Sequence, residues 1–176
     1  MSWPAGVDAN FARVQIGVVG PGAAEATPAR YELARQVGNL LARAGALVIC
    51  GGLGGVMEGV ARGAHEAGGL CVGIVPGHDR GAANRYLSAV VCSGIGEKRN
   101  EMVVDSSDAL VVIGGNEGTV NEVLLAKKHG VAAFGLDCAP VVTGGRRLDA
   151  VVIVDEPAQA VARAVATAHA GVRRKG

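Results

Sequence analysis

The sequence has few aromatic residues and almost no excess charge. Tryptophan, tyrosine and phenylalanine make up 3% of its 176 residues, so the core must be built from alanine, valine, leucine and isoleucine. Seventeen lysines and arginines face sixteen aspartates and glutamates, which leaves a formal net charge of +1. A chain without a basic excess has no electrostatic footprint for nucleic acid or for an anionic membrane, and we expect neither as a partner.

Long apolar runs and clustered metal ligands are also missing. No run approaches the roughly 18 apolar residues of a membrane span, and the N-terminus lacks the pattern of a secretory signal, so we expect a cytoplasmic protein. The cysteines form no Cys-x-x-Cys pair and the histidines are scattered, so we expect no metal site. The cysteines are then expected to be small buried apolar residues in a reducing compartment: Cys50, Cys71, Cys92 and Cys138.

Several common nucleotide and cofactor signatures do not occur. The absence of Gly-Lys-Ser and Gly-Lys-Thr excludes a P-loop NTPase, and no glycine loop has the full Gly-x-Gly-x-x-Gly spacing of a dinucleotide site. A pyridoxal phosphate decarboxylase needs a lysine for its Schiff base. Only Lys98 lies near the predicted site described below, so decarboxylase activity has no support.

Glycine, by contrast, is abundant, with 28 residues clustered between apolar segments. Short apolar runs alternate with longer amphipathic stretches, which is typical of strands that alternate with helices. We expect strands at 14–19, 46–50, 70–75, 87–92, 109–113, 131–136 and 151–154, and helices at 28–44, 56–67, 96–107, 118–129 and 157–170.

The predicted strands are continuously apolar, which indicates a sheet buried on both faces. Because crossover connections are right-handed, the strands should run parallel. We therefore predict an α/β fold, a Rossmann-like doubly wound sheet of about seven mainly parallel strands with helices on both faces. Residues 13–171 should form a single domain, between an irregular extension at 1–12 and a basic tail at 172–176.

Three glycine-rich loops are expected at one edge of this sheet. Ligands of open parallel sheets bind beyond the carboxyl ends of the strands. Glycine allows backbone N–H groups to approach a ligand, and a helix N-terminus adds about half a positive charge, so the loops favour a phosphate or nucleotide. The loops contain Gly20, Pro21 and Gly22; Gly51, Gly52, Gly54 and Gly55; and Gly114, Gly115, Asn116 and Gly118.

The polar residues around the third loop allow two interpretations. Thr119 and Glu122 have the Thr-x-x-Glu spacing of a capping box, in which both side chains satisfy backbone N–H groups. Alternatively, Thr119 binds a phosphate and Glu122 faces the sugar end of a ligand. Arg99, which precedes the fifth strand, is either a residue of a solvated face or of an ion pair, with Asn100 as its polar neighbour, or a ligand-binding residue.

These segments resemble the lonely-guy superfamily, whose members long carried a lysine decarboxylase label. The resemblance spans about 15–136. It includes the second glycine-rich loop, at 51–55, and Met57, which follows it. Cytokinin-activating phosphoribohydrolases of that family share the signature PGGxGTxxE and an arginine about nine residues before the Asp that precedes the fifth strand. Arg99 lies nine residues before Asp108, and Gly118, Thr119 and Glu122 match the end of the signature.

This resemblance implies Arg99 and Glu122 as a catalytic pair if the protein is an enzyme. It also implies ligand contacts from the three glycine loops, Met57, Asn100 and Thr119. The chain departs from the signature because Gly114 replaces the proline, Asn116 replaces the second glycine, and Asn100 replaces the lysine that usually follows the arginine.

The departures resemble a sister branch that includes the molybdenum cofactor carrier proteins. That branch implies a protein that binds and protects a phosphorylated pterin-type ligand. The family as a whole, whose members pair through helices, implies a homo-oligomer, dimer or tetramer. The molybdenum cofactor would be the carried ligand, and no other cofactor would be required.

Three functions therefore stay open. The leading one is a carrier of a phosphorylated small molecule of nucleotide or molybdopterin type. The second is a phosphoribohydrolase that cleaves the N-glycosidic bond of a nucleoside 5′-monophosphate. In that enzyme Glu122 would assist the oxocarbenium-like centre or activate water, and Arg99 would orient the ligand. The third is a nucleotide-sensing or scaffolding module whose assembly changes with the ligand.

Overall fold

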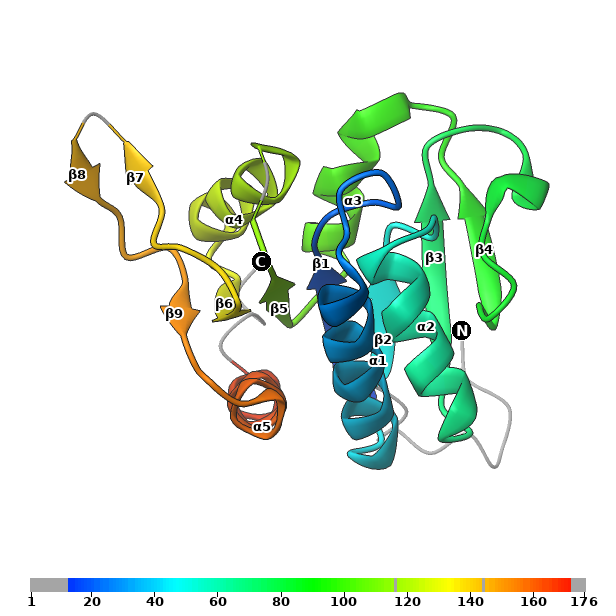
Figure 1. Cartoon of the computed structure of the whole chain (residues 1–176), viewed down its shortest axis with the longest axis horizontal. Coiled ribbons are helices and arrows are strands. Elements are labelled where there is room, and N and C mark those ends of the chain that lie inside the picture. Colours follow the sequence, from blue (N-terminus) through cyan, green and yellow to red (C-terminus); the bar gives the residue numbers. More distant parts are fainter. Residues whose placement is uncertain (1–12, 116, 144, 172–176) are drawn as a thin grey trace, which may run out of the picture.

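The computed structural model describes residues 13–115, 117–143 and 145–171, so the expected extension at 1–12 and the basic tail at 172–176 lie outside the described residues. A seven-stranded sheet with all neighbours parallel forms its centre, in the order β4-β3-β2-β1-β5-β6-β9 (Figure 1). The strands are β1 (Gln15–Val19), β2 (Leu47–Cys50), β3 (Cys71–Val75), β4 (Ala89–Cys92), β5 (Ala109–Ile113), β6 (Ala132–Leu136) and β9 (Val152–Ile153).

Helices cover both faces of the sheet, which confirms the predicted Rossmann-like, doubly wound architecture. Each set of helices encloses its own apolar core against the sheet. One face carries α1 (Pro28–Arg43), α2 (Val56–Glu66) and α5 (Pro157–His169), and the other carries α3 (Arg99–Asp105) and α4 (Glu117–His129). Two short 3-10 turns, η1 (Arg80–Ala82) and η2 (Gly96–Lys98), lie after β3 and before α3.

Strand β5 explains the unbroken apolar runs of the sequence. All five of its residues are buried. Ala109, Val111 and Ile113 enter the core beneath α1, α2 and α5, whereas Leu110 and Val112 enter the core beneath α3 and α4. Successive side chains of a strand point to opposite faces, so a strand covered on both sides has no exposed face that would favour polar residues.

Helices α1 and α2 pack so closely that glycines of one helix lie against the backbone of the other. A Cβ built at Gly63 would lie 1.8 Å from the carbonyl oxygen of Arg35, and one at Gly38 would lie 2.1 Å from that of Val60. No side chain larger than hydrogen fits at either position. The small residues of these two helices therefore serve packing within the chain.

Several details differ from the sequence expectation. The helix predicted at 96–107 is divided into η2 and the shorter α3. A small antiparallel hairpin, β7 (Val142–Thr143) with β8 (Arg146–Arg147), lies outside the main sheet (left in Figure 1). Strand β4 begins two residues later than predicted and is partly exposed, since it forms the edge of the sheet. The expectation for the cysteines is wrong for Cys92 and Cys138, which are only partly buried.

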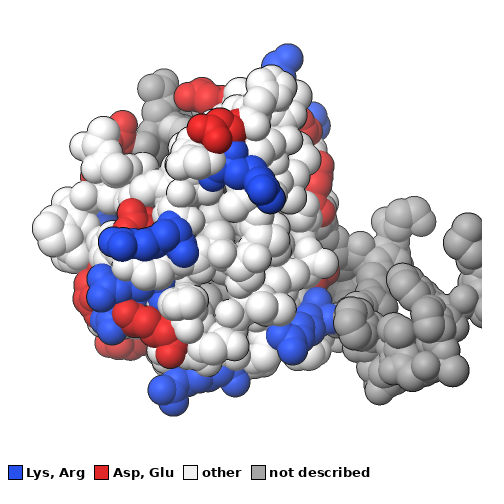
Figure 2. Space-filling model, turned by 90° about the vertical axis from the view of Figure 1, so that its right-hand side faces the viewer, with Lys and Arg blue, Asp and Glu red and all other residues white. Residues whose placement is uncertain are grey.

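The charged side chains are mixed in sign on the face seen in Figure 2, where lysine and arginine lie interspersed with aspartate and glutamate. One ion pair joins α1 to α2, because Arg35 Nε lies 2.7 Å from Glu66 Oε2. A second pair lies within α2, where Arg62 Nε is 2.9 Å from Glu66 Oε1. Among the described helices, none combines the length and the hydropathy required to cross a membrane.

Candidate functional site

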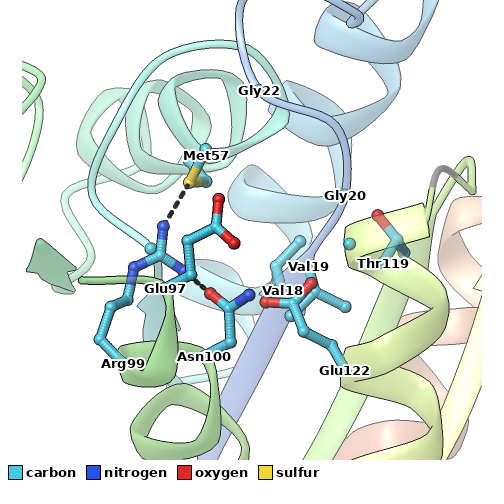
Figure 3. Close-up of a pocket in the computed structure, with 12 residues that line it drawn as sticks. Val18, Val19, Gly20, Gly22, Met57, Glu97, Arg99, Asn100, Thr119 and Glu122 are labelled. Carbon is cyan, nitrogen blue, oxygen red and sulfur yellow. Dashed lines mark hydrogen bonds between the residues drawn. The ribbon is translucent and has the colours of Figure 1, made fainter. Parts of the chain in front are cut away.

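A hollow of about 190 Å³ lies at the carboxyl ends of β1 and β5. These strands are neighbours at the centre of the sheet, where the strand order reverses. The crevice at such a reversal is where open α/β sheets bind their ligands. The hollow therefore occupies the position expected for a ligand site (Figure 3). It is lined by Val18, Val19, Gly20, Gly22, Gly51, Met57, Glu97, Arg99, Asn100, Gly118, Thr119 and Glu122.

The structure separates the predicted site residues into two groups. One group lines the hollow: Gly20, Gly22, Gly51, Met57, Arg99, Asn100, Gly118, Thr119 and Glu122. The described residues of the other group do not line it: Pro21, Gly52, Gly54, Gly55, Gly114 and Gly115. Asn116 lies outside the described residues.

The second glycine loop mainly supports the first. The carbonyl oxygen of Pro21 accepts a hydrogen bond from the N–H of Val56 at 3.0 Å. Gly55 has a φ of +69°, and a Cβ there would lie 2.5 Å from the carbonyl carbon of Gly22. A side chain at Gly55 would push away the loop that borders the hollow, so this glycine acts through its size and backbone conformation.

Gly114 shows why proline is absent from this position. Its φ is +68°, and its N–H donates a hydrogen bond to the carbonyl oxygen of Leu136 at 2.9 Å. Proline holds φ near about −65° and has no N–H, so it could adopt neither feature. Gly115 is exposed and borders a separate hollow together with Arg30 and Asp137.

Arg99 is buried at the start of α3, with 8% of its surface exposed, so the surface interpretation is wrong. Its Nη1 donates to Asn100 Oδ1, and its Nη2 lies 4.0 Å from Met57 Sδ. Within the described part of the chain, its Nε is buried without a hydrogen-bond partner. Burial lowers the pKa of Arg99, and the nearby charge of Glu122 partly opposes this. An orphaned buried N–H is costly, so this arginine is held at the site against an energetic penalty.

Glu122 and Thr119 lie on the buried side of α4 and border the hollow (Figure 3). Helix α4 begins at Glu117, so Thr119 is already inside the helix and cannot be its N-cap. The capping-box interpretation is therefore wrong. Burial raises the pKa of Glu122 to about 7, although the positive charge of Arg99 lowers it. The carboxyl group is thus close to half protonated at neutral pH.

Glu97 is a lining residue that the sequence analysis missed. It lies in η2, and Figure 3 shows its carboxylate directed into the hollow beside Asn100. Residues three positions apart share a face of a helical turn, and this spacing relative to Asn100 is the signal that could have identified Glu97.

A separate polar cluster joins α3 to the C-terminal end of α4. His129 Nδ1 lies 2.7 Å from Asp105 Oδ1, and His129 Nε2 lies 3.6 Å from Glu101 Oε1. One ligand atom from each residue lies within 4.8 Å of the others, so the group could hold a metal ion. The spacing along the chain did not indicate it, because its members come from two helices. None of the three lines the hollow.

Comparison with known proteins agrees with this architecture. A protein of uncharacterised function from Archaeoglobus fulgidus is 42% identical over 135 residues, which is 77% of this chain and 87% of that protein. The molybdenum cofactor binding protein of Rippkaea orientalis is 31% identical with a TM-score of 0.75, over 84% of this chain and 92% of that one. The molybdenum cofactor carrier protein of Chlamydomonas reinhardtii is 29% identical with a TM-score of 0.79, over 90% of this chain and 99% of that one.

The model of the SLOG cluster4 family matches residues 13–166, which is most of the chain. Together with the two solved structures, this match confirms the resemblance to the lonely-guy superfamily and its branch of molybdenum cofactor carriers. The chain belongs to the SLOG cluster4 family.

Proposed function

We propose that this protein binds and carries a phosphorylated small molecule, a pterin of the molybdenum cofactor type, in the hollow between the carboxyl end of β1 and α4. The observation that carries the proposal is the meeting of the glycine loop after β1 with the first turn of α4 at this hollow. Backbone N–H groups and the positive end of a helix together favour a phosphate. The similarity to a molybdenum cofactor binding protein and a molybdenum cofactor carrier supports the pterin.

In this proposal the phosphate lies between Gly20, Gly22 and the start of α4. A Cβ at Gly20 would lie 2.5 Å from the carbonyl oxygen of Ile113, so the loop passes close to the end of β5. Gly118 and Thr119 supply the first turn of the helix on the other side. Arg99 lies on the side of Met57 and Gly51, where its guanidinium group would meet an oxygen of the ligand outside the phosphate.

A phosphoribohydrolase is the second candidate, and Glu122 is the observation that favours it. A buried carboxyl group with a pKa of about 7, beside an arginine in a concave site, is typical of general acid–base residues. Glu122 would then activate water or stabilise the sugar cation, while Arg99 would orient the nucleotide.

Two parallel measurements separate the candidates. Purified protein is mixed with molybdenum cofactor, passed over a gel-filtration column and assayed for bound pterin. The same preparation is incubated with AMP and GMP, and free base is measured by chromatography. The carrier proposal predicts retained pterin and no free base. Base release that disappears in Glu122→Gln would instead establish the hydrolase. If the wild type neither retains pterin nor releases free base, both functions are contradicted.

A homo-oligomer, dimer or tetramer, forms part of the proposal. Strand β9 is at one edge of the sheet, and Val152 and Ile153 on it are 47% and 37% exposed. Val142 in the neighbouring hairpin is 60% exposed. Exposed apolar residues on an edge strand, one side of which is free to pair, favour contact with another chain. Sedimentation should give a dimer or tetramer, and Val152→Glu should shift it toward the monomer; a monomeric wild type would contradict this part.

A further inference from the structure

The hollow proposed for an anionic ligand also contains two carboxylates. Figure 3 shows the side chains of Glu97, from the turn η2, and of Glu122, from α4, at this hollow. A carboxylate repels a phosphate, so these groups should face a different part of the ligand. Glu122 is the stronger counter-charge of Arg99, because its charge raises the pKa of that guanidinium more than the charge of Glu97 does. Of the two carboxylates, Glu97 therefore has the weaker interaction with Arg99, and pairing with this arginine does not account for its position.

The amide of Asn100 has a fixed orientation beside Glu97. Its Oδ1 accepts a hydrogen bond from Arg99 Nη1. A guanidinium group has only donors, so the amide oxygen must face Arg99 and the amide nitrogen must point away from it. Glu97 and Asn100 lie three residues apart, and both line the hollow. Together they present two carboxylate acceptors next to one amide donor.

The complement of this pattern is a heterocycle edge with two donors followed by one acceptor. An exocyclic amino group, a ring N–H and a ring carbonyl provide that order in 2-amino-4-oxopyrimidine rings, the class to which guanine and pterins belong. Adenine has no such edge, because its ring nitrogen accepts and it has no carbonyl group. We propose that Glu97 and Asn100 recognise the amino–oxo edge of the ligand, while its phosphate lies across the hollow beside Gly20 and Thr119. This assignment rests on the proposed function, since it concerns the same hollow.

The ligand pair GMP and IMP tests the assignment, because IMP keeps the ring N–H and the carbonyl but lacks the amino group. Binding to the full chain is measured by calorimetry. We expect the wild type to bind GMP about tenfold more tightly than IMP, as one hydrogen bond to a charged group provides. In Glu97→Gln the amide replaces one acceptor with a donor, and the preference should fall to about twofold or less.

Glu101→Gln is the matched control. Glu101 lies four residues after Glu97, in the first turn of α3, and does not line the hollow. This variant should keep the tenfold preference. Equal affinities for GMP and IMP in the wild type would overturn the assignment, and so would an unchanged preference in Glu97→Gln. In both cases the proposed phosphate site would stand. If neither nucleotide nor molybdenum cofactor binds, the proposed function fails as well.

Discussion

Arg99 and Glu122 border one hollow from different helices, and both are less than a tenth exposed. The positive charge of Arg99 lowers the pKa of Glu122, but burial has the larger and opposite effect. The pKa of the carboxyl group is therefore raised to about 7, and Glu122 is not fully ionised at neutral pH. The charge of the hollow therefore changes close to neutral pH. Protonated Glu122 leaves the site more attractive to an anion than ionised Glu122 does.

The raised pKa of Glu122 makes stability depend on pH. Between its ordinary value of 4.5 and about 7, the native state holds a proton that the unfolded chain has released. Raising the pH through this window therefore favours unfolding. Relative to Glu122→Gln, the wild type should lose on the order of 2 kcal/mol in free energy of unfolding between pH 5.5 and 8. Urea titrations at both pH values measure the difference.

Glu156→Gln is the control for this prediction, because Glu156 is exposed and makes no side-chain cap bond at the start of α5. Its unfolding curves should follow those of the wild type at each pH. If the wild type and Glu122→Gln respond to pH in parallel, the carboxyl group of Glu122 titrates as it would in water.

Arg99→Met should separate binding from folding. Removing a buried guanidinium group relieves its desolvation, but it also removes the counter-charge of buried Glu122. At pH 5.5, where Glu122 is largely protonated, no unpaired buried charge remains, so stability should stay within about 1 kcal/mol of the wild type. Affinity for the phosphorylated ligand should fall at least about tenfold, because the ligand loses a charged donor. Arg43→Met, at the exposed end of α1, should change neither property. Unchanged affinity in Arg99→Met would remove this arginine from the site.

The contact between α1 and α2 should not tolerate a methyl group at Gly63. Alanine is the better helix former, yet its Cβ would lie 1.8 Å from the carbonyl oxygen of Arg35. We expect Gly63→Ala to lower the free energy of unfolding by about 2 kcal/mol or more, as overpacking usually does. Gly77→Ala is the control, since nothing lies within 4 Å of a Cβ there. Thermal unfolding of both variants tests the contact, and a stabilised Gly63→Ala would contradict it.

The adjacent glycines 114 and 115 should respond differently to alanine. Gly114 has a φ of +68°, whereas a Cβ on Gly115 would meet nothing within 4 Å. Gly114→Ala should cost about 1–2 kcal/mol, because side chains disfavour this conformation and the new Cβ displaces Arg30. Gly115→Ala should be close to neutral. Equal stabilities in chemical denaturation would show that the positive φ has no energetic consequence.

The sequence predicted the fold well because burial on both faces leaves a plain signal. The five buried residues of β5 and the glycine loops after β1 and β2 could be located from the order of apolar runs and glycine clusters along the chain. The β7–β8 hairpin could not, since two-residue strands such as Val142–Thr143 are too short to show a period.

Many of the predicted residues line the candidate hollow, but several local details of the hollow were not predicted. The capping-box interpretation failed because α4 begins before Thr119, and helix ends are set by local contacts that spacing does not show. Glu97 was missed because its direction depends on the turn η2. The cluster around His129 was missed because it joins residues that are distant in the chain.

Gly118→Asp provides the most direct test of the central claim. A carboxylate in the first turn of α4 suits the helix dipole, so the fold should not suffer, but it would occupy the proposed phosphate position. Val120→Asp adds the same charge to the same turn at an exposed residue that does not line the hollow. We predict that Gly118→Asp loses retention of molybdenum cofactor on gel filtration while Val120→Asp keeps it. Equal retention by both variants would contradict a phosphate site in this hollow.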